Sequence, residues 1–368
     1  MKVETSSEMP PGFPNKLSGP AVWSGQVADQ DYVTRLTTSD LASIEAALKH
    51  FQGLGIERHL ISQERFPLST LLVAKLRDLS QAVHNGRFFG VLRGLDPNRF
   101  TEEQNVIIYG GIAQYVGKDR ADMIWLYDRA KGSLSDENQA KFPPNELNNA
   151  MDFHTDVDAG DILSLYTLGL SKSGGRQHLA SFWTVYNDLA QNEPEVLKVL
   201  ASDWRYEMKK QQGVEVINRP VISIVDGRVQ INFAAAFLKG SAYIPRLHDS
   251  PKLTIAQENA IDSLLNCCRK HCMALSQAPG DMLFVNNLAV LHARDSFTDD
   301  SQQVAGGKTR KMMSVMLRDP ELAWRKPPSV AIEMGKKFAK RGTDAELFLG
   351  TTEQYEQFRD KFAMLRHD

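Results

Sequence analysis

The sequence predicts an α+β protein with a mainly β core, a sandwich or barrel that carries helices on its outside. After Pro143-Pro144, short apolar or alternating runs of strand length follow one another, each bounded by Gly, Pro, Asn or Asp. Before that point the apolar residues recur mostly at helical spacing, and this spacing returns between the strands at about 184–201 and 254–276. The strand-rich part therefore forms the core, and the helical parts cover it.

Three helices and one strand are expected before residue 117. The first helix begins after Ser39-Asp40 and ends at Gly53, because its apolar residues fall three and four positions apart up to that glycine. The second runs from Leu68 to about His84, where Asn85-Gly86 ends it. A buried strand follows at 88–92, and Thr101 caps a third helix that reaches Val116.

The strands of the core are expected in the second half of the chain. Asp226-Gly227 lies between two apolar runs and predicts a two-residue hairpin. No linker-like stretch separates the helices from the strands, so one domain is expected over 21–368, preceded by an extended, proline-rich arm at 1–20. Within the domain we expect helices over 39–84, a core over about 85–328 and a helical tail over 329–368. The expected core strands lie at 162–168, 178–182, 221–225, 229–233, 282–291 and 311–317.

Composition excludes several classes of protein. With 43 Lys+Arg against 45 Asp+Glu the net charge is −2, so no global field favours nucleic acid or an anionic membrane. No window reaches the 18 apolar residues that predict a membrane span, and no secretory signal is visible. The three cysteines, Cys267, Cys268 and Cys272, cannot build a disulfide framework. A cytoplasmic protein with a small-molecule substrate is therefore expected, and formation of a homo-oligomer stays open.

The first feature with chemical content is His154-Thr155-Asp156. In an extended segment, residues two apart point to the same face, so the imidazole and the carboxylate can share one cation. The pattern is weak by itself, because nine His and 45 acidic residues in 368 positions give about one such pair by chance.

A second segment strengthens the metal hypothesis. Pro279-Gly280-Asp281 precedes an apolar run that ends at His292. Two imidazoles and one carboxylate on one side of a metal leave three positions open, which is the arrangement of non-haem Fe(II) oxygenases. A closed structural zinc site would need a fourth protein ligand, and none lies nearby in the sequence.

In these segments the sequence resembles the taurine dioxygenase-like (TauD/TfdA) family of Fe(II)/2-oxoglutarate-dependent dioxygenases, in particular its fungal members of secondary metabolism. The resemblance covers most of residues 85 to 328 and rests on the order and spacing of several motifs. These are FFGVLRGL at 88–95, HTD at 154–156, SGGRQHLASFWTVYNDLA at 173–190, VDGRVQINF at 225–233, PGDMLFVNNLAVLHARDSFTD at 279–299 and MLRDPELAW at 316–324.

The resemblance implies a fold, a metal site and a reaction. The fold is a double-stranded β-helix, a cupin-like jelly roll with flanking helices. The metal ligands, and with them the catalytic centre, fall on His154, Asp156 and His292. Fe(II), 2-oxoglutarate and O₂ then oxidise an unactivated C–H by hydroxylation, desaturation or ring formation, and 2-oxoglutarate becomes succinate. Because Asp156 keeps the carboxylate that halogenating relatives lack, halogenation is not expected.

Such an enzyme needs an arginine for the distal carboxylate of 2-oxoglutarate, since the planar guanidinium binds a carboxylate through two hydrogen bonds. Arg310 and Arg318 are the candidates, 18 and 26 residues after His292, and spacing favours Arg310. Many fungal relatives carry an arginine where this chain has Ser314. The alternative for Arg318 is a structural ion pair, with Asp319 or Glu321.

Two further residues are candidates for the pocket. Gln177 occupies the position where relatives often use a threonine to hold 2-oxoglutarate; an ordinary strand residue is the equal alternative. Arg294 lies two residues after His292 and is a candidate for binding a substrate carboxylate, with a solvent-exposed strand end as the alternative. Asn286-Asn287 is expected to fix a turn rather than to touch substrate.

Two other functions stay open at this point. One is an iron oxygenase of the same fold that does not use 2-oxoglutarate, because position 314 lacks the arginine. The other is a non-catalytic jelly-roll binding protein. The CCRKHC segment at 267–272 lies in an expected helix without zinc-ligand spacing, so buried thiols are favoured there over a metal site.

Overall fold

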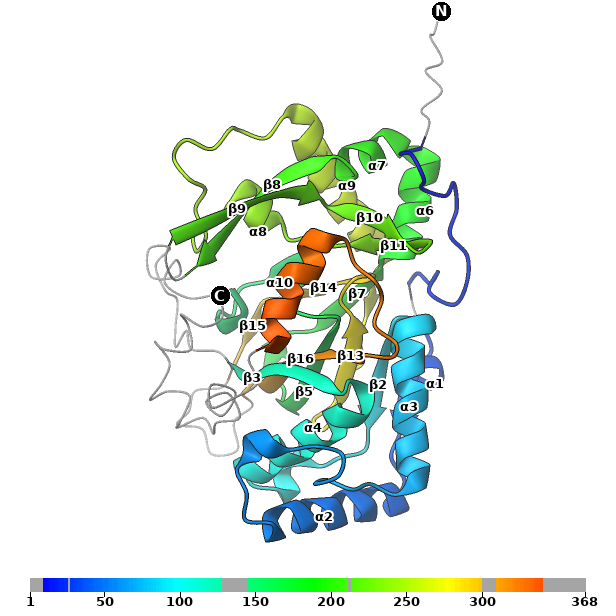
Figure 1. Cartoon of the computed structure of the whole chain (residues 1–368), viewed down its shortest axis with the longest axis vertical. Coiled ribbons are helices and arrows are strands. Elements are labelled where there is room, and N and C mark those ends of the chain that lie inside the picture. The colour runs from blue at the N-terminus through cyan, green and yellow to red at the C-terminus, as the bar shows by residue number, and fades with distance from the viewer. Residues whose placement is uncertain (1–8, 26, 128–143, 211–212, 300–308, 340–368) are drawn as a thin grey trace, which may run out of the picture.

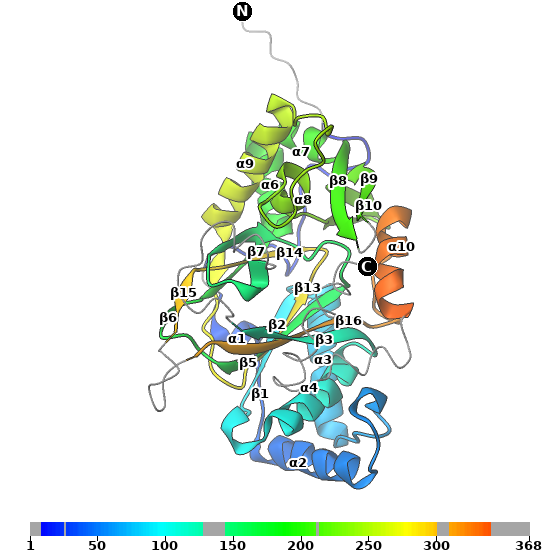
Figure 2. The ribbon, with the colours of Figure 1, turned by 90° about the vertical axis from the view of Figure 1, so that its left-hand side faces the viewer.

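The computed structural model of the chain describes residues 9–25, 27–127, 144–210, 213–299 and 309–339. Two β-sheets lie face to face at the centre, and helices cover the outer side of each (Figures 1 and 2). The mixed helix-and-sheet organisation predicted from the sequence is confirmed. Among these residues no helix is long and apolar enough to cross a membrane.

The larger sheet has six strands in the order β1-β2-β13-β5-β16-β3, and the smaller has four in the order β12-β7-β14-β4. All neighbours within these two sheets are antiparallel except β1 and β2. The strands of the larger sheet are β1 (Val33–Arg35), β2 (Phe89–Arg93), β13 (Met282–Asn286), β5 (Ile162–Gly169), β16 (Lys311–Arg318) and β3 (Asp119–Tyr127). Those of the smaller are β12 (Met273–Ala274), β7 (Gln177–Ser181), β14 (Val290–Arg294) and β4 (Met151–His154).

The buried apolar residues form three clusters: one between the two sheets, one on the outer side of the larger sheet and one on the outer side of the smaller sheet. On β16, Met312 belongs to the cluster between the sheets, whereas Met313 and Val315 belong to the cluster outside the larger sheet. Successive strand residues point to opposite faces, so each strand serves two cores. The interior cluster receives Leu163, Leu165, Leu283, Val285 and Met312 from the larger sheet and Leu179 and Val290 from the smaller.

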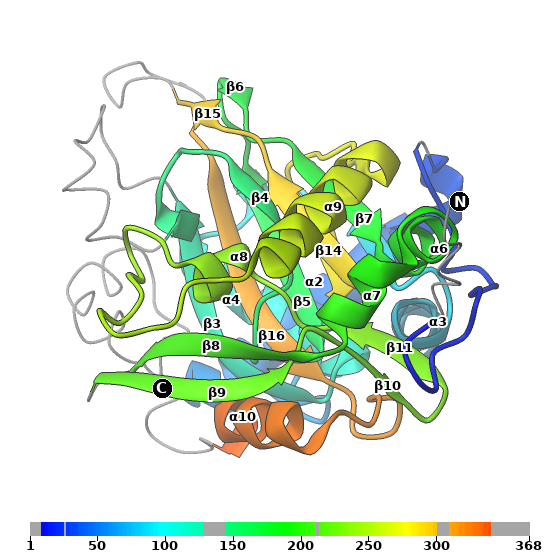
Figure 3. The ribbon, with the colours of Figure 1, turned by 90° about the horizontal axis from the view of Figure 1, so that it is seen from above.

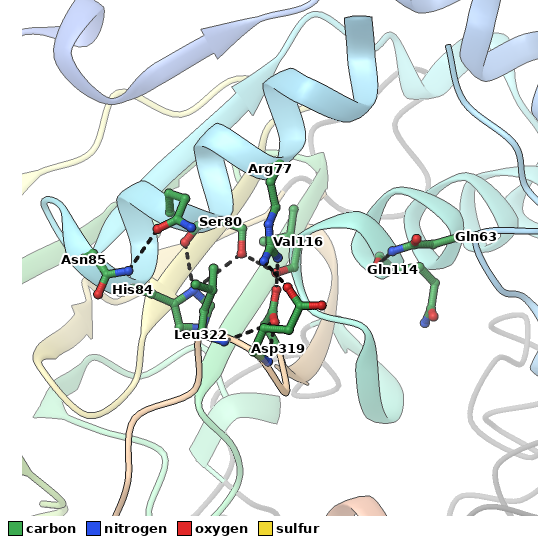
Figure 4. Close-up of polar contacts among 11 residues, drawn as sticks. Gln63, Arg77, Ser80, His84, Asn85, Gln114, Val116, Asp319 and Leu322 are labelled. Atoms are coloured by element: carbon green, nitrogen blue, oxygen red, sulfur yellow. Dashed lines mark hydrogen bonds and ion pairs between the residues drawn. The ribbon is translucent and has the colours of Figure 1, made fainter. Parts of the chain in front are cut away.

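Three helices lie on the outer side of the larger sheet. α3 (Thr70–Asn85) packs against β2 and β13, α4 (Glu102–Val116) lies beside α3, and α2 (Thr38–Gly53) packs against α3 and α4. The predicted cap at Thr101 is confirmed, with a reciprocal bond from Gln104. Polar contacts join α3 to its surroundings, since Arg77 pairs with Asp319 and the Ser80 hydroxyl donates to Val116 O at 2.7 Å (Figure 4).

The smaller sheet is covered by α6 (Phe182–Asn192), α7 (Pro194–Leu200) and α9 (Ile255–His271), and Figure 3 shows α9 crossing above β4, β7 and β14. The single helix expected at 184–201 is therefore wrong. Pro194 cannot donate a backbone hydrogen bond and restricts Glu193, whose φ of −144° and ψ of 55° end α6.

Two antiparallel ribbons lie beside these helices, β8 (Asp203–Lys210) with β9 (Gly213–Pro220), and β10 (Ile222–Val225) with β11 (Arg228–Ile231). The hairpin predicted at Asp226-Gly227 is confirmed, with φ of 51° and 73° at its two turn residues. The single strand expected at 282–291 is wrong, because Asn286 starts a turn between β13 and β14.

The arm predicted at 1–20 has no helix or strand in its described part, residues 9–20. It is bound along α6: the Asn187 amide accepts from Leu17 N at 2.7 Å and donates to Leu17 O at 2.9 Å. The predicted tail begins as α10 (Pro328–Ala339), and the rest of that prediction, 340–368, lies outside the described residues. The remaining short elements are α1 (Asp29–Tyr32), α8 (Ala235–Lys239), β6 (Ser173–Gly174), β15 (Phe297–Thr298), η1 (Arg58–Leu60), η2 (Pro97–Arg99) and η3 (Pro144–Glu146).

Candidate metal centre

The pairing of β4 with β14 brings two histidines together. His154 ends β4 and lies directly opposite His292 of β14, and their ring centroids are 4.2 Å apart. Asp156 follows β4 by two residues, and its Oδ1 atom lies 3.8 Å from Nε2 of each histidine. The three potential ligand atoms lie within 4.8 Å of one another. The three residues singled out in the sequence are thus brought to one point.

The donor set fits a divalent transition metal. His154 Nδ1 lies 2.7 Å from Asp152 O, and a carbonyl can only accept, so Nδ1 carries the proton and Nε2 faces the cluster with its lone pair. Two imidazole nitrogens and one carboxylate oxygen are the ligands that non-haem iron prefers. The side chains of His154, Asp156 and His292 keep 15%, 31% and 16% of their surface exposed, so the cluster is open on one side.

Burial shifts the ionisation of this cluster. Desolvation, helped by the nearby His154 ring, lowers the pKa of His292 well below its usual range. Desolvation raises the pKa of the Asp156 carboxyl, and His154 opposes that rise. The neutral imidazole is the form that binds a metal, so His292 is in the ligating form at neutral pH.

A second polar group lies next to this cluster, toward the end of β14. Gln177 of β7 pairs across the ladder with Arg294, two residues after His292. Gln177 Nε2 and Arg310 Nη2 both approach the sulfur of Met312, at 3.8 and 2.8 Å. The structure therefore brings three of the four polar residues predicted for the pocket together.

Phe297 is part of the same group and was missed from the sequence. The guanidinium carbons of Arg294 and Arg310 lie 5.0 and 5.2 Å from the centre of its ring. These distances are those of cation–π contacts. Phe297 belongs to the two-residue strand β15, too short to show a periodic pattern, so no sequence signal marks this contact.

Arg294 is buried, with 7% of its surface exposed, so the alternative of a solvent-exposed strand end is wrong. Its Nη2 atom donates to Leu147 O at 2.6 Å and to Asn149 O at 2.5 Å. The side chain thereby ties the segment before β4 to β14, close to both histidines.

Arg318 lies elsewhere. It is the last residue of β16, about 26 Å along the strand from Arg310 at the usual rise per residue. Its Nη2 atom is 3.1 Å from Asp119 Oδ2, and its guanidinium lies over the ring of Phe338. The structural ion pair considered for Arg318 therefore exists, but its partner is Asp119.

Ser314 lies on the interior side of β16, where the alternation of that strand places it. Met312 and Met316 flank it on the same face and contact the cluster between the sheets. Ser314 is 7% exposed. A small hydroxyl side chain therefore lies in the interior at this position of β16.

The cysteine segment forms a different cluster from the one considered in the sequence. Cys267 and His271 of α9 meet Asp188 of α6, with potential ligand atoms within 4.8 Å. The Asp188 carboxylate already accepts hydrogen bonds from Lys270 at 2.6 Å, from His271 and from Asn192 at 2.5 Å. Burial, with Asp188 nearby, raises the pKa of the Cys267 thiol to about 12. These hydrogen bonds explain why the three side chains lie together. The Lys270 ammonium already neutralises the Asp188 carboxylate and would repel a metal ion there.

Comparison with known proteins agrees with this geometry. Residues 50–316 match the family described as "Taurine catabolism dioxygenase TauD, TfdA family". The "Taurine hydroxylase-like protein SAT17" of Stachybotrys chartarum is 34% identical over 354 residues, 92% of this chain and 89% of that protein. The "FR-33289 synthase" of Streptomyces rubellomurinus is 22% identical over 296 residues, 77% of this chain and 85% of that protein.

Solved structures share the fold. An asparagine oxygenase in complex with Fe(II), 3-hydroxyasparagine and succinate superposes with a TM-score of 0.58 at 15% identity, over 80% of this chain and 98% of that one. The non-haem iron oxygenase OrfP in complex with Fe and α-ketoglutaric acid gives a TM-score of 0.55 at 15% identity, over 78% of this chain and 93% of that one. The central sandwich is thus of the cupin-like type. By its sequence and its His-Asp-His cluster, the chain belongs to the TauD/TfdA family and is a non-haem Fe(II)/2-oxoglutarate-dependent dioxygenase.

Proposed function

We propose that the protein binds Fe(II) through His154, Asp156 and His292 and oxidises an unactivated C–H of a small molecule by hydroxylation, desaturation or ring formation. The observation that carries this proposal is the meeting of the three side chains across β4 and β14, open on one side. When bound, iron supplies the oxidative chemistry, coupled to decarboxylation of 2-oxoglutarate to succinate. The chain supplies the ligands, the orientation of both substrates and the exclusion of water.

Arg310 is the residue we assign to the distal carboxylate of 2-oxoglutarate. It is 5% exposed, and both its guanidinium and the Gln177 amide contact the sulfur of Met312. Gln177 pairs across the ladder with Arg294, which lies two residues after the candidate ligand His292. A buried guanidinium in such a place can hold a carboxylate by charge-assisted hydrogen bonds. Arg318 lies at the far end of β16, about 26 Å along the strand from Arg310, which supports the choice.

Gln177 is the second residue that we assign to 2-oxoglutarate. It is 5% exposed, and among the described residues its Nε2 atom makes a long contact, 3.8 Å, with the sulfur of Met312, so the amide can donate to a carboxylate instead. Arg294 holds the carbonyl groups of Leu147 and Asn149, which favours a role in shaping the pocket wall. Direct binding of a substrate carboxylate by Arg294 stays a prediction.

The position of Arg310 also bears on the alternative enzyme that would not use 2-oxoglutarate. That alternative rested on Ser314. A buried arginine four residues earlier, on the same face of the β16 segment, supplies the charge that Ser314 lacks. We further infer that residues 21–368 form one domain whose sandwich is a double-stranded β-helix. A place in secondary metabolism is part of the same proposal, and the likeness to the FR-33289 synthase supports it.

The test is succinate formation from 2-oxoglutarate in the presence of Fe(II) and O₂, measured with and without a mixture of candidate small-molecule substrates. Wild-type protein is expected to form succinate in an Fe(II)-dependent manner. His154→Ala and Asp156→Ala should each lose at least about 100-fold, because each removes one of three metal ligands. Arg318→Lys, away from the cluster, is the control. Equal rates in wild type and both ligand variants would contradict the proposal.

A further inference from the structure

Two buried amides stand side by side in the turn between β13 and β14. Asn286 is 2% exposed and Asn287 is 1% exposed. Asn286 serves its own turn, as expected from the sequence: its Oδ1 atom accepts from Leu288 N at 3.0 Å, and its Nδ2 atom donates to Val83 O at 3.3 Å. Neither contact reaches the loop after β4 that carries Asp156.

The Asn287 side chain instead contacts the loop that follows β4. Its Oδ1 atom accepts the backbone N–H of Asp156 at 2.8 Å, and its Nδ2 atom donates to Asp156 O at 2.8 Å and to Gly160 O at 2.9 Å. One side chain thus holds the backbone N–H and C=O of Asp156 itself. The acceptor and both donor hydrogens of the amide are engaged with the loop that follows β4.

The contact joins the two segments that supply the ligands. Asn287 precedes His292 by five residues in the β13–β14 hairpin, and Asp156 is 131 residues away in sequence. Fixing both polar groups of the Asp156 backbone fixes the direction of its Cα–Cβ bond. The amide therefore sets where the Asp156 carboxylate stands relative to His292.

The loop needs such support because it is not in a relaxed conformation. Asp158 has a φ of 59°, which is uncommon for a residue other than glycine. Its buried carboxylate accepts from Arg219 at 2.7 Å and from Asn232 at 2.9 Å, while Thr155 N donates to Phe233 O at 2.7 Å. Anchors thus hold the loop on either side of Asp156. Ala159 N also donates to Asp156 O at 3.2 Å within the loop, and Asn287 ties both backbone groups of Asp156 to the β13–β14 turn.

We propose that Asn287 is a positioning residue for the iron centre, which orients the Asp156 carboxylate toward the two histidines before metal arrives. This role rests on the proposed function, in which Asp156 is a metal ligand. Partners that orient a ligand from behind typically change metal affinity by about 10- to 100-fold when they are removed. Loss of Asn287 is expected to act on metal affinity beyond its effect on folding.

The experiment compares Asn287→Ala with Asn286→Ala, a matched variant of the adjacent buried amide. The Fe(II) dissociation constant is measured anaerobically by competition with a chelator, and the unfolding free energy of the apoprotein is measured alongside. Asn287→Ala should weaken Fe(II) binding about 10- to 100-fold. Asn286→Ala should lose a similar amount of stability and keep its Fe(II) affinity within about threefold. If Asn287→Ala does not fold, Asn287→Ser, which keeps a polar side chain but is too short to hold both backbone groups of Asp156, replaces it.

Asp156→Ala separates the two claims. If Asp156→Ala binds Fe(II) as tightly as wild type, the metal assignment fails and the inference fails with it. If Asp156→Ala loses Fe(II) but Asn287→Ala retains it, the role of Asn287 is overturned while the proposed function stands. Equal weakening in Asn286→Ala and Asn287→Ala would reduce Asn287 to a structural residue and also overturn the inference.

Discussion

At the scale of single residues, the candidate ligands could be predicted because chemistry restricts them to few residue types. His154-x-Asp156 and the distal His292 followed from spacing and from the resemblance. The choice between Arg310 and Arg318 could not be made with certainty, since both lie on one face of the same segment. What separates them is the partner each finds in space, Met312 and Phe297 for one and Asp119 for the other.

The choice of arginine leads to a prediction about 2-oxoglutarate. Arg310→Lys should weaken 2-oxoglutarate binding by about 10- to 100-fold, because charge-assisted hydrogen bonds contribute about 1.5–3 kcal/mol and a lysine cannot reproduce the planar fork. Arg318→Lys should change the affinity by no more than about threefold, because Arg318 pairs with Asp119 at the far end of β16, about 26 Å along the strand from Arg310. Anaerobic binding titrations measure both. A larger effect at Arg318 than at Arg310 would reverse the assignment.

At the scale of elements, strands and helices with clear periodicity were predicted, and those with mixed patterns were missed. The ribbon strand β8 carries Asp, Arg, Glu and Lys, which hid it, although Trp204, Tyr206 and Met208 alternate along it and are buried. Strand β4 has only four residues, too few for a pattern. The break between β13 and β14 depends on side-chain bonds of Asn286, which apolar periodicity does not report.

The turn before β13 gives a prediction about close packing of the backbone. Gly280 has a φ of 94°, and a Cβ there would lie 1.9 Å from Leu95 O, so the backbone must shift. Gly227 in the Asp226-Gly227 hairpin has a φ of 73° with nothing within 4 Å. Gly227→Ala should therefore cost about 1–2 kcal/mol of unfolding free energy, for backbone strain alone. Gly280→Ala should cost about 1–3 kcal/mol more. Equal losses in denaturant unfolding would contradict the close approach.

The contact between α6 and α9 gives a prediction about how the unfolding free energy depends on pH. The Lys270 hydrogen bond, with those of His271 and Asn192, lowers the pKa of Asp188 below its usual value. A carboxylate with a depressed folded pKa stabilises the fold above its unfolded pKa, about 3.9, and loses that contribution as pH falls through the folded pKa. Asp188→Asn should cost about 1–2 kcal/mol at pH 7. The difference from wild type should shrink as pH falls below about 4, and a difference independent of pH would refute the ionic contribution.

At the scale of the whole molecule, two sheets enclose one apolar core and expose two outer faces to helices (Figure 2). The two candidate histidine ligands lie on the smaller sheet, and Asp156 follows β4 of that sheet. Arg310 precedes β16 of the larger sheet, so the proposed site needs both sheets in register. Register is set by pairings between segments more than a hundred residues apart, such as His154 with His292. Sequence spacing therefore indicated which residues take part but not how they meet.

The most direct test of the central claim is an anaerobic titration of the Fe(II)-loaded protein with 2-oxoglutarate, followed by visible absorption. If His154, Asp156 and His292 hold iron with open positions, chelation of the oxo-acid should produce a weak metal-to-ligand charge-transfer band that saturates with 2-oxoglutarate. The band should be absent in Asp156→Ala and should require higher 2-oxoglutarate in Arg310→Lys. Absence of the band in wild-type protein that has bound Fe(II) would contradict the account.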